Sequence, residues 1–368
     1  MLQKTPRRIL GFALLLYGST ALAFTLITIP QEQVSPSNTI TDSTTLETQV
    51  QPIAGTIRAQ LLSLRRPKAA AKVALAGSML AANAHASSRS DVDYLAAAGS
   101  SGAGTGSGDS ESLWISAASN SLENEFSRTA FHGNTNNLLA GFDLTRSDKY
   151  VLGISVGHEA SNYVTTFNAG NEKTQGFNVN PYFALLLSDT WSLDLILGYG
   201  QFNTRQSRTL GSIAVPLATV AVDSEFSSKR GFASTNLTNV STWGDWKLTG
   251  SLGYLGSRRE QDAYVETNGN AIASARQTAE QWNLLGEAAY GRGNAETFVG
   301  AMYEHTRDPQ KVVFATGEQP ANDPDSVLLT AGWRYVGKGL TGSFAFSSRQ
   351  AQKQVAEYGF SMVLRVDL

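Results

Sequence analysis

The feature that most constrains this sequence is an alternation of apolar and polar side chains, which recurs between Trp114 and Leu368. In residues 191–200 every odd position is Trp, Leu or Tyr, while the even positions are Ser, Asp, Gly and one Ile, Ile196. The same pattern returns at 246–254 and 327–335. A period of two is that of a β-strand with one apolar face. The region is therefore predicted to be all-β.

Two architectures bury or shield such strands. The apolar face can pack on a second sheet in a soluble sandwich, or it can meet lipid while the polar face lines a lumen. The apolar stripes are about nine to eleven residues long, which is the length of a tilted transmembrane strand. They begin or end in Trp or Tyr, as residues at a membrane interface do. Only 16% of the residues are charged, against about 25% in an average soluble domain. These features favour a transmembrane barrel.

The spacing of turn residues predicts the number of strands. Five tight polar turns are expected at 146–149, 188–190, 244–245, 291–294 and 337–339. Six longer loops are expected near 123–135, 164–173, 206–222, 260–273, 307–325 and 349–353. Short turns that alternate with long loops are typical of outer-membrane barrels, in which the short turns are periplasmic. The prediction is a twelve-stranded antiparallel transmembrane β-barrel with both ends on the periplasmic side.

The N-terminus has the pattern of an export signal. Lys4, Arg7 and Arg8 precede an apolar run, and Ala21 and Ala23 stand at the spacing of a signal peptidase site. We predict a signal peptide at 1–23 that is cleaved after Ala23. An uncleaved anchor is the alternative, because residues 24–29 lengthen the apolar run toward the ~20 residues of a membrane span.

Residues 24–112 form a short N-terminal segment before the predicted barrel at 113–368. Its start is Ser, Thr, Gln and Pro rich, and we expect it to be extended or disordered. Apolar residues at three- and four-residue spacing predict a helix over 44–66, which Pro52 could restrict to its second half. An Ala-rich stretch at 68–86 is helix-prone. The Gly/Ser linker at 99–108 marks a domain boundary.

Several segments carry a resemblance to a known family. They are the Trp-containing first strand 113–117, the segments 138–144 and 150–157, the Leu-Gly-Tyr-Gly at 197–200 and the alternating C-terminus 358–368. Together with the twelve expected strands, residues 113–368 resemble the translocator β-domain of autotransporters, the type V secretion family. The resemblance implies a barrel in the Gram-negative outer membrane that exports or displays its own N-terminal segment without a cofactor. It also implies a helix inside the pore.

The polar faces of the expected strands supply candidate lumen residues. We predict that they set the charge of the pore and hold the helix: Asp143, Asn178, Asn180, Asp194, Lys247, Asn283, Glu287, Glu304, Arg334 and Arg365. Arg58, Arg65 and Arg66 of the helix could face the lumen acids. A helix outside the pore with solvated charges is the alternative.

The last strand is the predicted recognition signal for the barrel-assembly machinery. Its outward positions are Tyr358, Phe360, Met362, Leu364, Val366 and Leu368. Many relatives end in an aromatic residue, whereas this chain ends in Leu368. Periplasmic chaperones, outer-membrane lipids and lipopolysaccharide are the other expected partners, and the barrel is expected to be a monomer. A net charge of −2 argues against nucleic-acid binding.

Two further functions stay open at the level of the sequence. The barrel could be a passive channel, or a surface-binding protein that uses the loops 206–222 and 307–325. An enzyme at the outer rim would need His132, His158 or His305, but isolated loop histidines do not define a site, and we predict no enzymatic activity. The chain has no Cys and four His, so no metal site or cofactor is expected.

Overall fold

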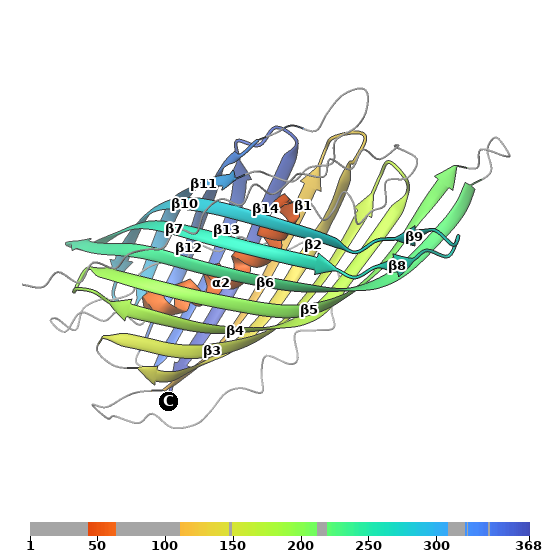
Figure 1. Ribbon diagram of the computed structural model, residues 1–368. Coiled ribbons are helices and arrows are strands. Elements are labelled where there is room, and N and C mark those ends of the chain that lie inside the picture. The colour runs from red at the N-terminus through yellow and green to blue at the C-terminus, as the bar shows by residue number, and fades with distance from the viewer. Residues whose placement is uncertain are drawn as a thin grey trace, which may run out of the picture.

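The computed structural model describes residues 43–63, 111–146, 149–211, 219–307, 321, 323–337 and 339–368. They form a barrel of long tilted strands around one helix, α2 (Figure 1). The helix is Ser43–Ser63 and the strands are β1 Ser112–Asn124, β2 Phe131–Arg146, β3 Tyr150–Thr165, β4 Gly170–Leu186, β5 Trp191–Gly211, β6 Thr219–Trp243, β7 Trp246–Gln261, β8 Tyr264–Val265, β9 Ala271–Ile272, β10 Ala275–Arg292, β11 Ala295–Arg307, β12 Asp325–Val336, β13 Leu340–Gln350 and β14 Val355–Asp367.

The barrel is closed by twelve antiparallel strands, which confirms the predicted fold class. The order is β1-β14-β13-β12-β11-β10-β7-β6-β5-β4-β3-β2, with β8 and β9 as a separate two-stranded sheet. Closure comes from pairing the first strand with the last, from Ser112 opposite Asp367 to Asn124 opposite Val355. Every strand of the barrel therefore has a hydrogen-bonded neighbour on both sides, which is what a spanning sheet requires in lipid.

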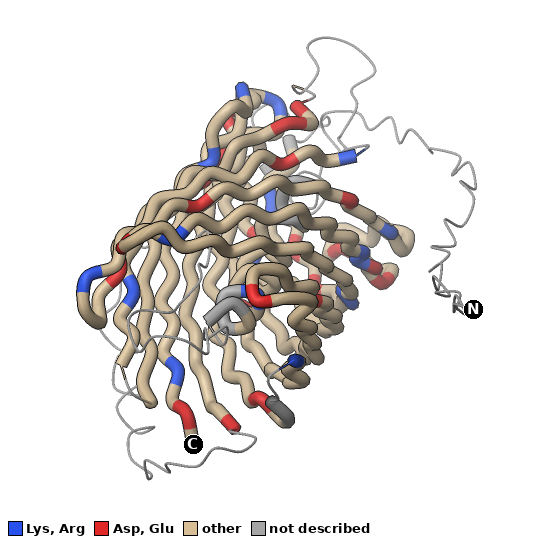
Figure 2. The backbone as a smooth tube through the Cα atoms, turned by 90° about the vertical axis from the view of Figure 1, so that its left-hand side faces the viewer, with Lys and Arg blue, Asp and Glu red and all other residues tan. Residues whose placement is uncertain are grey.

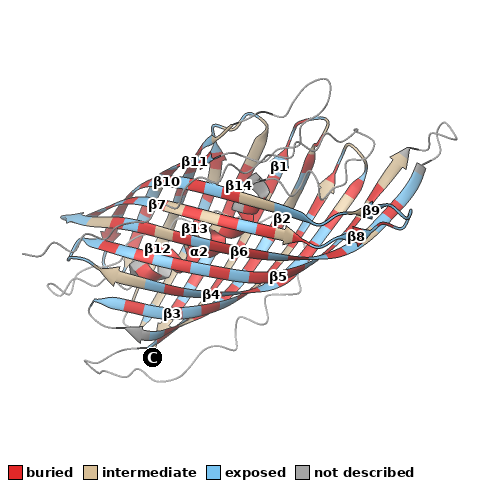
Figure 3. Cartoon of the chain, viewed as in Figure 1, coloured by how far each residue is buried: buried red, intermediate tan, exposed pale blue. Residues whose placement is uncertain are grey.

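The alternation of the sequence becomes an alternation of burial (Figure 3). On β7, for example, Leu248 and Leu252 are exposed while Lys247 and Ser251 are buried inside the barrel. Rings cluster at both ends of the apolar outer face. Trp246 pairs with Tyr290 near the tight turns and Tyr254 with Trp282 near the loops, at ring-centroid distances of 5.2 and 4.9 Å. Charged residues gather toward the strand ends (Figure 2).

The tight turns lie at the end of the barrel where β1 begins and β14 ends. Gly244 links β6 to β7 with φ of +60°, and Gly293 links β10 to β11 with φ of +65°. Two-residue hairpins need such positive φ values, which glycine adopts without steric cost. We call this end the turn end and the opposite one the loop end.

The loop predicted at 206–222 is instead mostly strand. β5 continues to Gly211 and β6 begins at Thr219, and their ladder extends from Trp191 opposite Asn239 to Gly211 opposite Thr219. The outer half of this hairpin has polar residues on both faces, so apolar alternation could not reveal it. It projects past the other strands beside β8 and β9 (Figure 1).

α2 begins at Ser43, one residue before the helix predicted over 44–66. It passes through Pro52 without a break, so the proline does not restrict it to its second half. An interior proline costs a helix about 3 kcal/mol, so packing against the barrel must offset that cost.

No helix among the described residues is long and apolar enough to cross a membrane. The signal peptide at 1–23 with Ala21 and Ala23, the Ala-rich 68–86 and the linker 99–108 lie outside the described residues.

Close packing of inward rings against glycine yields a first testable prediction. A Cβ on Gly153 would stand 2.2 Å from the Tyr182 ring, whereas a Cβ on Gly250, which faces outward, would meet nothing within 4 Å. We expect Gly153→Val to destabilise the barrel by ~1–3 kcal/mol, as overpacking does, and Gly250→Val to change little. Urea unfolding in lipid vesicles, followed by Trp fluorescence, measures both. Equal stabilities would contradict this packing.

Candidate functional site

The lumen of the barrel contains α2, which packs against an apolar patch on the inner wall (Figure 1). Apolar side chains of the helix form one cluster with inward-facing residues of the strands. From the helix come Leu46, Val50, Ile53, Ala54, Ile57 and Leu61; from the barrel come Trp114, Leu139, Val151, Tyr182, Ile196, Phe232, Leu255 and Ala279. Ile196, the one apolar residue on the polar face of residues 191–200, is thus part of the surface that receives the helix.

The direction of α2 follows from its contacts with β1. The Asn120 side-chain amide donates a hydrogen bond to the Thr48 carbonyl at 3.1 Å, and the hydroxyls of Thr56 and Ser116 lie 3.4 Å apart. Eight helical residues rise about 12 Å, and four strand residues span about 13 Å. The two elements therefore run antiparallel. Because β1 starts at the turn end, α2 starts toward the loop end.

An ionic cluster in the loop-end half of the lumen forms hydrogen bonds with the helix. The Arg349 guanidinium binds Glu357 at 2.7 Å and also pairs with Glu304. From α2, Gln51 accepts a hydrogen bond from Arg349 at 2.9 Å and donates one to Glu304, while Thr48 donates to Glu357 at 3.2 Å. Arg349, Glu304 and Glu357 are all buried. Loss of an ionic partner therefore destabilises the fold more here than it would at the protein surface.

A second contact of the same kind lies on β6. Arg230 pairs with Glu159 of β3, donates to the Gln49 side-chain oxygen at 2.6 Å, and stands 4.1 Å from the centroid of the Phe202 ring. Gln49 and Gln51 thus each bring a neutral amide to an arginine that already has a carboxylate partner. These two contacts bind the helix without adding charge to the lumen.

Nearer the turn end the helix contributes a charge of its own. Arg58 is 8% exposed. Asp194 of β5 and Glu287 of β10 attract it electrostatically. Both carboxylates are themselves buried, and Asp194 also accepts a hydrogen bond from Asn236 at 2.7 Å. A buried cation is stable only with such opposite charges nearby.

Two other polar clusters belong to the wall itself. Arg334 binds Glu287 at 2.7 Å and Glu296 at 3.0 Å, and Lys247 also pairs with Glu296. The Arg334 guanidinium lies 3.7 Å from the centroid of the Phe298 ring. These bonds join β7, β10, β11 and β12.

The remaining cluster lies where β1 meets β2 and β14. Ser112 donates to Asp143 and accepts from Arg365 at 2.8 Å, and Arg365 approaches Asp143 to 3.5 Å. Tyr182 donates to Asp143 at 2.8 Å and accepts from the Trp114 indole at 3.0 Å. The chain of contacts fastens the closing seam of the barrel near the turn end.

The ten predicted lumen residues are all buried on the inner wall. Asp143 meets Arg365; Lys247, Glu287 and Arg334 share one cluster; and Asn178 accepts a hydrogen bond from Asn180 at 2.7 Å. Glu304 is the member for which the structure records a hydrogen bond to the helix. Their roles in pore charge and helix binding stay predictions. Arg65 and Arg66 lie outside the described residues.

Sequence reasoning missed four residues that hold the helix or its partners, namely Glu159, Arg230, Arg349 and Glu357. All four occupy the inward phase of their strands, toward the loop end. The period of two, continued past the apolar stripes, would have found them. The C-terminal positions 358, 360, 362, 364 and 366 of β14 face outward, and they and Leu368, which follows the strand, are exposed or half-buried. Their part in assembly stays a prediction.

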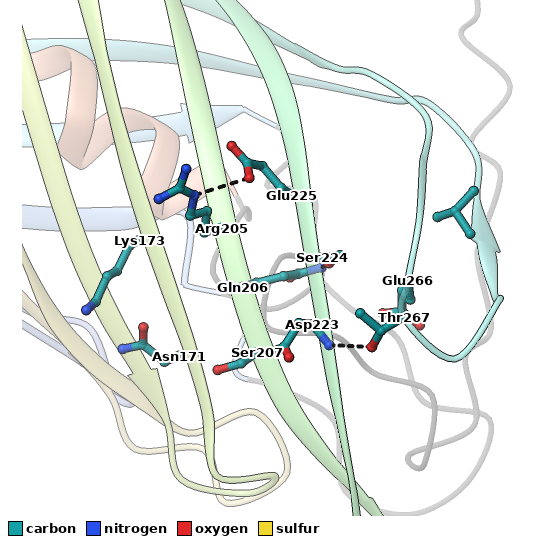
Figure 4. A pocket seen from close by; sticks show the side chains of 11 residues that line it. Asn171, Lys173, Arg205, Gln206, Ser207, Asp223, Ser224, Glu225, Glu266 and Thr267 are labelled. Carbon is teal, nitrogen blue, oxygen red and sulfur yellow. Dashed lines mark hydrogen bonds and ion pairs between the residues drawn. The ribbon is translucent and has the colours of Figure 1, made fainter.

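The projecting hairpin forms a polar pocket of about 620 Å³ with β4 and the β8–β9 segment (Figure 4). On its walls Arg205 pairs with Glu225 at 3.2 Å, and the Asp223 backbone N–H donates to the Thr267 hydroxyl at 3.0 Å. Glu266, which also lines the pocket, makes a buried ion pair of 2.8 Å with Arg208. Charges of both signs and the amides of Asn171 and Gln206 suit a polar ligand.

The rim histidines do not converge. His305 bonds Asp325 at 2.8 Å, and His158 packs on Phe177 at a ring-centroid distance of 4.9 Å. His132 stands on β2 opposite Glu123. Within the described residues no group of three or more His, Cys, Asp or Glu is placed to hold a metal ion.

A closed barrel with an apolar outer face and a helix through a charged lumen defines a class of membrane transport domain. The family model "Autotransporter beta-domain" matches residues 113–345, so the chain belongs to that family. Autotransporter β-domains are outer-membrane barrels with a translocator role rather than a catalytic one. The barrel of this chain is accordingly an outer-membrane transport domain. No curated protein matches the sequence.

Three solved autotransporter barrels share the fold. The translocator domain of NalP from Neisseria meningitidis has a TM-score of 0.58 at 14% identity, over 72% of this chain and 90% of that one. The β-domain of the Bordetella autotransporter BrkA has 0.56 at 16%, over 71% and 100%. The transport unit of AIDA-I from Escherichia coli has 0.51 at 13%, over 70% and 90%. At these identities the likeness concerns the fold alone.

The amide contacts of α2 give a second prediction. Replacing Gln49 and Gln51 by Ala removes hydrogen bonds to Arg230, Arg349 and Glu304 but leaves the Arg–Glu pairs intact. Each bond to a charged group contributes about 1.5–3 kcal/mol. We therefore expect the helix to leave the lumen at least about tenfold more often. Conductance in planar bilayers measures this as more frequent openings.

The matched control replaces Gln201 and Gln350, which are exposed, by Ala. This double variant should conduct as the unchanged protein does. If the Gln49/Gln51 variant also shows unchanged openings, these amides do not retain the helix.

Proposed function

We propose that this barrel carries the chain's own N-terminal segment across the outer membrane and displays it outside. The observation that carries the proposal is the direction of α2, which runs from the loop end to the turn end. In outer-membrane barrels the short turns are periplasmic and the loops are outside. The residues before Ser43 then leave the barrel on the cell exterior, and those after Ser63 leave it on the periplasmic side.

The lumen supports such passage by its chemistry. A polypeptide in lipid must satisfy every backbone group internally or within a protein cavity. Here the wall offers paired acids and bases, and α2 adds its amides to existing pairs. The helix side chains therefore find partners at several levels of the pore. This arrangement needs neither a nucleotide nor a cofactor, and the predicted signal peptide at 1–23 would deliver the chain to the periplasm.

Assembly is the second part of the proposal. We infer that β14, with its outward positions 358 to 368, presents the barrel to the assembly machinery before it pairs with β1. Leu368 replaces the terminal aromatic of many relatives, yet its N–H is already bonded to the Glu111 carbonyl at 3.0 Å in the closed barrel. Periplasmic chaperones would carry the unfolded strands, and a monomer is the expected state because the closed barrel has no free edge.

The pocket beside the projecting hairpin favours a second candidate function. It would let the barrel bind a polar surface ligand through β4, β5 and β6, whether or not the N-terminal segment is exported. The hydrogen bonds recorded for the described residues of α2 go to residues outside the pocket, so the two functions can be tested separately.

The direction of α2 is tested with two epitope tags, one near Ser37 and one within the Gly/Ser stretch 99–108. We expect external protease to remove the first tag from intact cells. The second should be cleaved only after the outer membrane is permeabilised, because the described residues on either side of it, Ser63 and Glu111, both lie toward the turn end. The barrel band on a gel, heated and unheated, controls for insertion. Protection of the first tag in a correctly inserted barrel would refute export.

A further inference from the structure

Four neighbouring strands carry cationic side chains on the outside of the barrel, just beyond the aromatic pair Tyr254–Trp282. The strands are β6, β7, β10 and β11, which are adjacent in the sheet. We define the outer basic patch by its cations and carboxylates: Lys229, Arg258, Arg276, Arg307, Glu260 and Glu280.

The register stacks these residues in successive rows above the rings. Tyr254 is directly opposite Trp282, and two residues farther out Glu280 is opposite Arg307. Arg258 occupies the next row, opposite Thr278. The patch therefore begins one row above the rings and belongs to the same outward face.

The third row completes the patch. Glu260 is opposite Lys229 on one side and Arg276 on the other. Successive rows are two residues apart along a strand, so the third row lies six residues, or about 20 Å, from the rings at about 3.3 Å per residue. Strands of such barrels tilt by about 40°, so the patch rises by about 15 Å above the rings.

Aromatic rings of this kind sit at the membrane–water interface. The hydrocarbon core is ~30 Å thick and the bilayer with its headgroups ~40–45 Å. The headgroup layer of the outer leaflet therefore lies within the first rows above Tyr254 and Trp282. Arg307 and Arg258 project from the wall at that depth.

The patch has an excess of positive charge. Arg258 and Arg276 both contact Glu260, the latter at 3.3 Å, and Arg307 approaches Glu280 to 3.7 Å. Four cations thus face two carboxylates. The arginine side chains are 50–65% exposed, so each pair stabilises the fold by less than about 1 kcal/mol and can exchange partners. Two acids lie beyond the patch: Asp325 on β12 is bonded to Tyr303 and His305, and Asp262 follows the end of β7 two residues after Glu260.

A second feature lies below the rings on the same two central strands. Gly250 of β7 is opposite Gly286 of β10, and a Cβ added to either would meet nothing within 4 Å. Both face outward, four residues or about 13 Å of strand from the rings. The apolar belt is therefore recessed directly beneath the patch, where an acyl chain can lie against the backbone.

We propose that the outer basic patch binds the phosphate groups of lipopolysaccharide, with an acyl chain in the recess at Gly250 and Gly286. Guanidinium groups bind phosphate through paired, charge-assisted hydrogen bonds. A phosphate with up to two negative charges matches the two excess cations better than a singly charged headgroup does. Arg258 and Arg307 hold it at headgroup depth, and Arg276 and Lys229 reach the sugar-borne phosphates farther out.

The experiment uses the whole barrel in phosphatidylcholine nanodiscs and measures binding of lipid A by native mass spectrometry. Dephosphorylated lipid A and phosphatidylglycerol serve as comparison lipids. We expect lipid A to bind at least about tenfold more tightly than its dephosphorylated form, which corresponds to one strong phosphate contact. The triple variant Arg258→Gln, Arg276→Gln, Arg307→Gln should lose that preference.

A matched control removes three exposed cations outside the patch and the pocket, by Lys149→Gln, Arg292→Gln and Lys353→Gln, and should keep the preference. Folding of all variants is checked by heat-modifiable mobility. The proposal fails if the patch variant binds lipid A as the unchanged barrel does, or if dephosphorylated lipid A binds equally well. It also fails if phosphatidylglycerol competes on equal terms, since the patch would then be a general anionic-lipid surface.

Discussion

The pairing of β1 with β14 is the interaction on which the rest of this structure depends. Lipid offers no hydrogen bonds, so a sheet with open edges could not span it. Thirteen opposed residue pairs between the first and last strands remove both edges at once. The polar contacts among Ser112, Asp143 and Arg365 lie at the same seam. Closure separates the lipid outside the barrel from the polar lumen inside it. The apolar outer face and the charged inner wall both follow from that separation.

Once closed, the barrel has an interior in which charge is tolerated and an exterior in which it is not. The inner wall carries both apolar and charged side chains. Apolar wall residues from β1 to β7 and from β10 receive Leu46, Ile53 and Ile57 of the helix, while paired arginines on β6 and β13 bind Gln49 and Gln51. The apolar contacts supply burial, which has no preferred direction, and the amides supply directed bonds. Together they hold α2 in one place along the axis.

Much of this could be predicted from the sequence, because a period of two is a direct consequence of strand geometry. The choice of the ten buried lumen residues rests on it, whereas the strand number follows from the alternation of tight turns and longer loops. The errors share one cause: apolar alternation reports contact with lipid and is silent beyond the membrane. The strands of 206–222 and the pair Arg230–Glu159 were missed for that reason. Ile196 looked like an exception to the pattern, because its partner is the helix and not the lipid.

The beginning of α2 shows a different limit. Intrinsic propensity places a break at Pro52, yet the helix continues through it because the lumen wall surrounds both halves. A helix in the pore would by itself be compatible with a segment that never left the periplasm. The direction of α2 supports the proposed export: Thr48 lies beside Asn120 and Thr56 beside Ser116, so the start of the helix is nearer the loops. A segment entering from the periplasm and stopping in the pore would present the opposite order. The polarity of the helix, rather than its presence, therefore carries the argument for export.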